Sequence, residues 1–193
     1  MPFNIPNLLT WLRILLIPLF VGIFYFEKSW VSLPNQNLVA TVIFTLAAVT
    51  DWFDGWLARK LNQTSAFGAF LDPVADKLMV AVTLFLIVQE NPTPLMAVTS
   101  AVIVGREITI SALREWMAEM GARGKVAVSS VGKLKTIFQM TGLSMMLFRS
   151  DVWFIPAFEL GVYCLVAAAA LTLWSMVVYL RAAWPELMRS GHS

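Results

Sequence analysis

Four aspartates share one 26-residue segment of an otherwise apolar part of the chain: Asp51, Asp54, Asp72 and Asp76. Carboxylates in a low-dielectric setting repel one another and are costly unless they are protonated, paired with bases or bound to metal. The nearby Arg59 and Lys77 are too few to neutralise all four. Because oxygen ligands select hard cations, the cluster predicts a site for two Mg²⁺ or Mn²⁺ ions about 4 Å apart.

Helix geometry would gather these side chains into two stripes. With about 100° of rotation per residue, the first helix places on one face the residues Asp51, Asp54, Gly55, Ala58 and Arg59. The second stripe has a spacing of four residues: Gly68, Asp72 and Asp76. A short connection would make the two helices antiparallel neighbours, so we expect the stripes to face each other. The small residues leave room for a bulky group, and an arginine suits a diphosphate.

The residues alone leave two other interpretations of this cluster open. Intramembrane carboxylates also act as proton or ion relays in transporters, and small residues at this spacing often only pack helices together. A lipid-binding scaffold without catalysis would leave the full set of four aspartates unexplained. A catalytic histidine or a zinc site of histidine and cysteine is excluded, because the chain holds only His192 and Cys164 of those types.

The elements that must position these side chains are predicted to be membrane-spanning helices. Hydrophobic residues make up 59% of the 193 and charged residues only 13%, and the mean hydropathy is +0.73. A spanning helix needs about 20 apolar residues, which leaves room for about six spans. We therefore expect one all-α polytopic membrane domain over residues 1–193, with spans near 8–27, 36–59, 69–89, 94–116, 132–149 and 153–181.

The basic residues predict the orientation of the chain. If the N-terminus is cytoplasmic, twelve of the 14 lysines and arginines lie at or toward the cytoplasm, and only Lys28 and Arg149 lie on the far side. No basic region precedes the first apolar run, so we expect neither a signal nor a transit peptide. These features favour a bacterial inner membrane with the site facing the cytoplasm. We expect no nucleic-acid partner.

The aspartate segment resembles the signature of the CDP-alcohol phosphotransferase family. The match is Asp51-x2-Asp54-Gly55-x2-Ala58-Arg59-x8-Gly68-x3-Asp72-x3-Asp76, with all eight fixed positions present. The resemblance implies a six-helix membrane fold, usually a homodimer, with its site open to the cytoplasmic leaflet. It further implies that the four aspartates hold two Mg²⁺ or Mn²⁺ ions and that Gly55, Ala58 and Arg59 contact the CDP moiety. Asp76 would also act as general base on an acceptor hydroxyl.

Nearly the full length of the chain also resembles one branch of this family, the bacterial phosphatidylglycerophosphate synthases. The similar segments are residues 4–13, 105–108, 111–117 and 132–136. That branch transfers a phosphatidyl group from CDP-diacylglycerol to glycerol 3-phosphate and releases CMP, which implies those two substrates and membrane lipids as partners. A relative that uses another acceptor, such as inositol phosphate, remains the alternative within the family.

Basic residues outside the aspartate segment independently favour an anionic acceptor. Arg106 lies within an apolar span, where an unpaired guanidinium is expensive, and Arg114 lies two turns further on. Lys133, Lys135 and Thr136 begin the next span. We expect these five residues to line one pocket for the acceptor's phosphate.

Each of these basic residues also has a purely structural explanation. Arg106 would then pair with Glu107 or with an aspartate of the cluster, and Arg114 would pair with a glutamate of its own helix, Glu115 or Glu119. The two lysines would serve as topology signals or contact anionic lipids.

The first span supplies weaker candidates for binding the CDP moiety. Asn7, Thr10 and Arg13 could reach the cytidine or the metal-bound diphosphate, as could Gly68 of the second stripe. Alternatively, Asn7 caps the first helix and Arg13 extends to the membrane interface.

Overall fold

The computed structural model describes residues 5–25, 32–61, 66–120, 130–151 and 154–190. These residues form six α-helices: α1 (Ile5–Tyr25), α2 (Leu33–Leu61), α3 (Ala66–Glu90), α4 (Pro94–Glu119), α5 (Ser130–Phe148) and α6 (Ala157–Ser190). The all-α fold class predicted from the sequence is therefore confirmed. The last helix continues to Ser190, beyond the expected end at residue 181.

The described helices carry the surface of an integral membrane protein. Four of them are long and apolar enough to cross a membrane, over Leu8–Tyr25, Leu33–Asp51, Pro94–Glu119 and Ala157–Trp184. The outward face of α1 is typical, because it exposes Leu8, Leu12, Leu15 and Leu19. Contiguous apolar surfaces of this extent are rare in soluble proteins but are expected where helices contact lipid. The expected total of about six spans stays a prediction.

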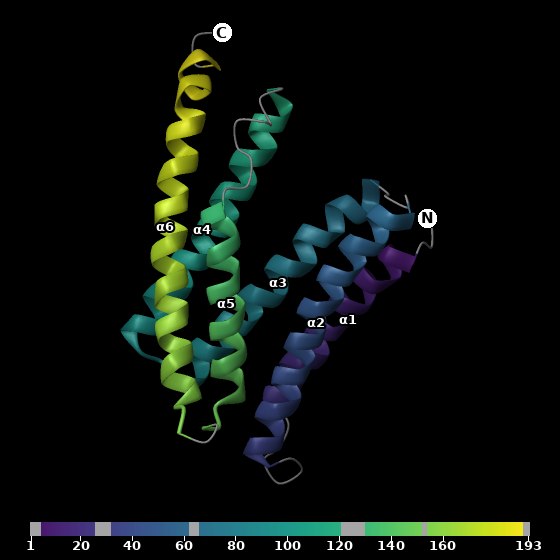
Figure 1. The fold of residues 1–193 in the computed structure, drawn as a ribbon, viewed down its shortest axis with the longest axis vertical. Helices are drawn as coiled ribbons and strands as arrows, with labels where there is room; N and C mark the ends of the chain where they lie inside the picture. Colours follow the sequence, from purple (N-terminus) through teal and green to yellow (C-terminus); the bar gives the residue numbers. More distant parts are fainter. Residues whose placement is uncertain (1–4, 26–31, 62–65, 121–129, 152–153, 191–193) are drawn as a thin grey trace.

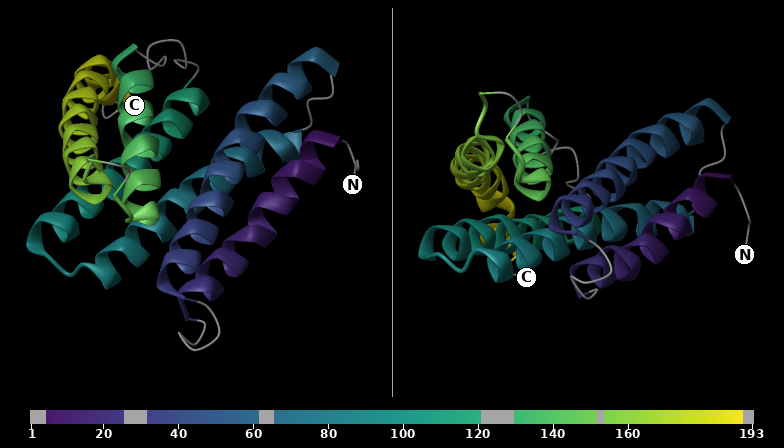
Figure 2. Two further views of the ribbon diagram at one scale, coloured as in Figure 1. Left: turned by 60° about the horizontal axis from the view of Figure 1, so that its bottom comes forward. Right: turned by 90° about the horizontal axis from the view of Figure 1, so that it is seen from below.

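The helices form two groups joined by α3. In Figure 1, α1 and α2 lie side by side on one side of the molecule, α4, α5 and α6 lie on the other, and α3 runs between them. The turned views in Figure 2 keep this grouping. Among the described residues, α1 packs along both α2 and α3, whereas α2 and α3 meet only over a short stretch. Thus α1 connects the two helices that carry the aspartates, which were expected to pair directly.

A buried cluster with members from every helix fixes the two groups relative to each other. One side chain from each of the six helices is at most 1% exposed: Phe20, Phe44, Leu84, Ile103, Leu143 and Leu165. In lipid, close packing rather than the hydrophobic effect holds helices together. This cluster therefore sets the distances between the helices that bear the charged side chains.

Two glycines allow α5 and α6 to approach closely. A Cβ atom on Gly142 would lie 2.9 Å from the carbonyl oxygen of Gly161, and a Cβ atom on Gly161 would lie 2.7 Å from Cγ of Met146. Small residues at such a contact are the usual means of packing membrane helices. The close contact holds α5, and with it Lys135, against α6.

The start of α4 is set by local sequence. Thr93 is the N-cap residue, and its side-chain oxygen accepts a hydrogen bond of 3.3 Å from the backbone N–H of Met96. Pro94 follows at the first helical position, where its missing N–H costs nothing. This start fixes the register of the helix that carries Arg106, Glu107 and Arg114.

Candidate active site

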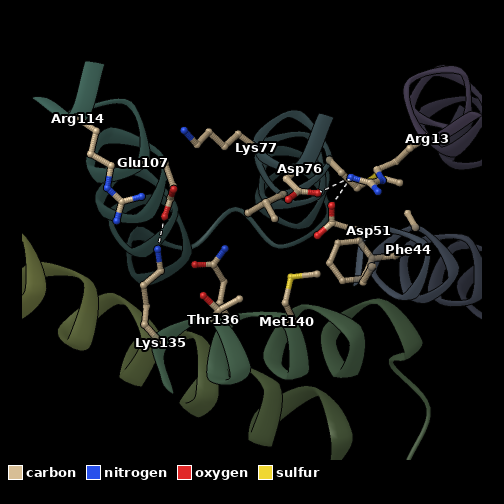
Figure 3. Close-up of a pocket in the computed structure, with 15 residues that line it drawn as sticks. Arg13, Phe44, Asp51, Asp76, Lys77, Glu107, Arg114, Lys135, Thr136 and Met140 are labelled. Atoms are coloured by element: carbon tan, nitrogen blue, oxygen red, sulfur yellow. Dashed lines mark hydrogen bonds and ion pairs between the residues drawn. The ribbon is translucent and has the colours of Figure 1, made fainter. Parts of the chain in front are cut away.

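A cavity of about 600 Å³ lies between α1, α2, α3, α4 and α5. Its described polar lining consists of Arg13, Asp51, Asp76, Lys77, Glu107, Arg114, Lys135, Thr136 and Gln139. Figure 3 shows Arg13, Asp51 and Asp76 together at one end, which we call the aspartate end. Lys77, Glu107, Arg114, Lys135 and Thr136 form what we call the basic end. A cavity of this size suits a small-molecule ligand.

At the aspartate end, two carboxylates share one cation. Nη1 of Arg13 lies 2.7 Å from Oδ1 of Asp51 and 2.8 Å from Oδ1 of Asp76. The Arg13 side chain is 1% exposed, whereas those of Asp51 and Asp76 are 35% and 46% exposed. Two carboxylates from different helices therefore converge on one point that a positive charge occupies, and both remain open to the cavity.

Helix periodicity explains how α2 and α3 present these carboxylates. On α2, the residues Phe44, Ala47, Ala48 and Asp51 line the cavity at spacings of three and four. On α3, Asp76 is followed at the same spacings by Met79 and Val80. Each carboxylate thus ends an apolar stripe that faces the other helices. The apolar side chains of these stripes form one part of the cavity wall, and the carboxylates lie at the accessible end of that wall.

Half of the predicted aspartate cluster lies outside the side chains that the structure describes. The backbone is helical at the positions in question, but nothing is described of the side chains of Asn7, Asp54, Gly55, Ala58, Arg59, Gly68, Asp72 and Lys133. Among the described side chains, no three acidic, histidine or cysteine residues gather as a metal site. The predicted four-aspartate site is therefore described at two of its four positions, Asp51 and Asp76.

Thr10, which was predicted to bind the CDP moiety, lies near Arg13 along α1 but is not part of the described cavity wall. Thr10 lies one turn before Arg13 and is 1% exposed. The described lining of the cavity includes Arg13 and does not include Thr10.

The basic end brings together residues from α3, α4 and α5. Lys135 is 4% exposed and pairs with the carboxylate of Glu107. Lys77 donates a hydrogen bond to the hydroxyl of Ser111. Arg114 and Thr136 complete the wall. Three of the predicted phosphate ligands, Arg114, Lys135 and Thr136, therefore share one cavity.

Arg106 lies behind this wall rather than in it. Its side chain is 7% exposed, and the residue is not part of the described lining of the cavity. Nη1 of Arg106 lies 3.3 Å from the carboxylate of Glu107, and Nη2 donates to the hydroxyl of Ser175 at 3.0 Å. This placement matches the alternative in which Arg106 pairs with its neighbour.

Three polar residues of the cavity wall, Lys77, Glu107 and Gln139, were not predicted as site residues. Glu107 lines the basic end and contacts both Arg106 and Lys135. A signal for it was available, because Glu107 and Arg114 are seven residues apart and therefore share a helix face. Gln139 also lines the cavity, one turn after Lys135 and Thr136 on α5. A neutral amide within an apolar helix gives little signal in a sequence.

The two ends of the cavity offer different chemistry. Carboxylates that converge on one cation can ligate a hard metal ion, and a carboxylate that opens onto a cavity can accept a proton. The basic end holds three positive side chains and one negative one, Lys77, Arg114 and Lys135 against Glu107, which leaves an excess of two positive charges. That excess matches a doubly charged phosphate group.

Comparisons with known proteins extend over nearly the whole chain. A model of the family named CDP-alcohol phosphatidyltransferase matches residues 3–178, a range that includes every described residue of the cavity wall. The CDP-diacylglycerol--glycerol-3-phosphate 3-phosphatidyltransferase of Escherichia coli (strain K12) is 50% identical over 188 residues, which cover 97% of this chain and 99% of that protein. The proteins of the same name from Salmonella typhimurium (strain LT2) and Salmonella paratyphi A are 49% identical over the same shares.

Proposed function

The chain belongs to the CDP-alcohol phosphatidyltransferase family, and from this premise we propose that it transfers the phosphatidyl group of CDP-diacylglycerol to sn-glycerol 3-phosphate. The products are phosphatidylglycerophosphate and CMP, and the reaction is a step of phospholipid biosynthesis. Relatives that carry this activity in their names are about half identical to the chain over nearly its full length. We take residues 1–193 as a single catalytic domain.

The observation that carries this proposal is the polarity of the cavity. One space joins two carboxylates of the family signature, Asp51 and Asp76, to a basic wall formed by Arg114, Lys135 and Thr136. A donor bound at the aspartate end and a phosphorylated acceptor bound at the basic end would meet inside it. Holding two reactants in one oriented arrangement is a large part of catalysis for such a transfer.

The aspartate end fits a divalent metal ion. Asp51 and Asp76 already converge on one cationic atom, and a set of carboxylate oxygens suits Mg²⁺ or Mn²⁺. We propose that Asp51, Asp54, Asp72 and Asp76 hold two such ions. When bound, these ions would neutralise the diphosphate of the donor and stabilise CMP as leaving group. We assign Asn7, Thr10, Gly55, Ala58, Arg59 and Gly68 to binding of the CDP moiety.

The basic end fits the phosphate of the acceptor. Arg114 offers a guanidinium, Lys135 an ammonium and Thr136 a hydroxyl to phosphate oxygens. The pairing of Lys135 with Glu107 holds the ammonium in place and limits the excess charge at this end. We also retain Lys133 as a ligand of this phosphate. Arg106 lies behind the wall, so its contribution is support for Glu107 rather than direct contact.

We propose Asp76 as the general base. Its carboxylate opens onto the cavity and is held by Arg13, which keeps it oriented. The acceptor's primary hydroxyl gives its proton to Asp76, and its oxygen forms a bond to the phosphorus that carries the lipid. The bond from that phosphorus to the CMP oxygen breaks on the opposite side, as an in-line transfer requires. The positive groups at the basic end hold the acceptor's phosphate while the hydroxyl reacts.

We further propose that the protein lies in a bacterial inner membrane as a homodimer, with its N-terminus and cavity facing the cytoplasm. The asymmetric distribution of lysine and arginine supports this orientation. A Glu119→Cys variant in a Cys164→Ser background should react with a membrane-impermeant maleimide only in inverted vesicles. Reaction in right-side-out vesicles would contradict the orientation. Light scattering in detergent should give twice the 21.5 kDa of one chain.

An acceptor panel tests the proposed function. Purified protein in detergent receives CDP-diacylglycerol and Mg²⁺, and CMP release is followed with glycerol 3-phosphate, inositol phosphate, serine or phosphatidylglycerol as acceptor. We expect release with glycerol 3-phosphate alone, and its loss when a chelator removes the metal. Release with inositol phosphate instead would keep the assignment of the aspartate end and overturn that of the acceptor. Flux of ions in liposomes without CMP release would favour a transporter.

A further inference from the structure

α6 contributes no residue to the described wall of the cavity, yet one of its side chains touches two arginines of α4. Tyr179 is 4% exposed. Its ring centroid lies 5.6 Å from Cζ of Arg106 and 5.4 Å from Cζ of Arg114. Nη2 of Arg114 also donates a hydrogen bond of 3.4 Å to the hydroxyl of Tyr179. Both distances to the ring lie within the range of cation–π contacts.

The two arginines have different surroundings. Arg106 is behind the cavity wall and is tied to Glu107 and Ser175. Arg114 forms part of the wall, and Figure 3 shows its side chain beside Glu107 at the basic end. The ring of Tyr179 thus joins an arginine that is anchored in the protein to one that faces the proposed substrate.

We infer that Tyr179 is a positioning residue for the acceptor's phosphate and acts through Arg114. An arginine has a long stem with many rotamers, and a side chain that is ordered before binding loses less entropy when the ligand arrives. A buried aromatic ring restricts the guanidinium by stacking, and its hydroxyl restricts the direction of one N–H group. This inference rests on the proposed function, because it assigns the wall at Arg114 to an acceptor phosphate.

The test is a set of variants measured separately for the two substrates. Tyr179→Leu removes ring and hydroxyl, whereas Tyr179→Phe keeps the ring. We expect Tyr179→Leu to raise the KM for glycerol 3-phosphate by about tenfold and leave the KM for CDP-diacylglycerol unchanged. Tyr179→Phe should have a smaller effect in the same direction. Tyr163→Leu is the matched control, since Tyr163 is on the same helix and is 72% exposed.

A double-variant cycle distinguishes positioning from a general effect on the fold. In an Arg114→Gln background, Tyr179→Leu should cause no further increase in the KM for glycerol 3-phosphate. Equal increases in both KM values, or an added increase in the Arg114→Gln background, would overturn the inference. Thermal unfolding in detergent shows whether Tyr179→Leu folds. If Tyr179→Leu does not fold, Tyr179→Phe replaces it in the cycle.

A binding measurement keeps this inference separate from the proposed function. If the proposed function is wrong, the unchanged protein will release no CMP with glycerol 3-phosphate. The affinity for inorganic phosphate is therefore also measured by calorimetry for the same single and double variants. Tyr179→Leu should weaken that binding only when Arg114 is present. Unchanged binding of phosphate in Tyr179→Leu would overturn the inference whatever the enzyme's acceptor is.

Discussion

Asp51 and Asp76 belong to different helices, and both accept a hydrogen bond from the same atom, Nη1 of Arg13, at 2.7 and 2.8 Å. The guanidinium is buried, and the two carboxylates compensate its charge. A residue of α1 therefore fixes how far apart the carboxylates of α2 and α3 lie. Any ion that the two aspartates bind must share this space with Arg13.

The first prediction concerns this shared cation. Arg13→Gln should lower the melting temperature of the metal-free protein in detergent by about 3–8 °C, a modest cost because both carboxylates are partly exposed. Mg²⁺ should raise the melting temperature of the variant more than that of the unchanged protein, since no guanidinium competes for the carboxylates. Differential scanning fluorimetry with and without Mg²⁺ measures both effects.

Arg149→Gln is the matched control for that experiment. Arg149 also pairs with a carboxylate, at 3.2 Å from Glu90, but its side chain is 33% exposed, whereas that of Arg13 is 1% exposed. Its removal should change the melting temperature little and should not alter the response to Mg²⁺. An Arg13→Gln protein that behaves like this control would contradict the role given to Arg13.

The second prediction concerns the carboxylate at the basic end. Glu107→Gln leaves the buried Lys135 and Arg106 without their negative partner, so the melting temperature should fall by about 5–10 °C. Glycerol 3-phosphate should restore more stability to this variant than to the unchanged protein, because an anion can replace the lost charge. Thermal unfolding over a series of glycerol 3-phosphate concentrations checks this.

Glu119→Gln serves as the comparison for Glu107→Gln. Glu119 lies on the same helix and is exposed. The Glu119→Gln protein should have the same melting temperature as the unchanged protein, both with and without glycerol 3-phosphate. If Glu107→Gln shows no greater response to glycerol 3-phosphate than Glu119→Gln, the basic end does not bind that anion as proposed.

The third prediction tests the close contact between α5 and α6. Gly142→Ala places a methyl group 2.9 Å from the carbonyl oxygen of Gly161, and we expect a loss of about 1–3 kcal/mol in stability. The same substitution at Gly22 or Gly105 meets nothing within 4 Å, so these variants should be as stable as the unchanged protein or slightly more stable. Urea titration in detergent ranks the three. Equal stability of all three would contradict this packing.

The sequence predicted the fold class and the family because both depend on local patterns. Long apolar stretches require helices in a membrane, and the spacing of the aspartates matched a family signature. Of the five residues predicted to line one phosphate pocket, Arg114, Lys135 and Thr136 line one cavity, Arg106 lies behind its wall, and nothing is described of the side chain of Lys133. That cavity also includes Asp51 and Asp76.

The contacts that the sequence could not predict join residues far apart in the chain. The arrangement of Arg13 between Asp51 and Asp76 depends on α1 packing along both α2 and α3. The same is true of Tyr179, which meets Arg114 only because α6 packs against α4. Hydrophobic periodicity identifies which face of a helix is buried, but it does not identify the neighbour that covers it.

The fourth prediction tests the central claim, that the two ends of one cavity perform separate tasks. Two variants are compared for steady-state CMP release and for binding of CDP by calorimetry, each in the presence of Mg²⁺. Asp76→Asn should lose turnover by about a hundredfold or more, because the proton acceptor and one proposed ligand of the metal are gone. Arg114→Gln should raise the KM for glycerol 3-phosphate by about tenfold or more and leave CDP binding unchanged.

The KM for glycerol 3-phosphate in Arg114→Gln, with CDP binding measured on the same preparation, is the most direct single measurement. An increase in that KM with unchanged CDP binding is the result that a separate acceptor site at the basic end predicts. An unchanged KM, or a parallel loss of CDP binding, would contradict the division of the cavity into a donor end and an acceptor end.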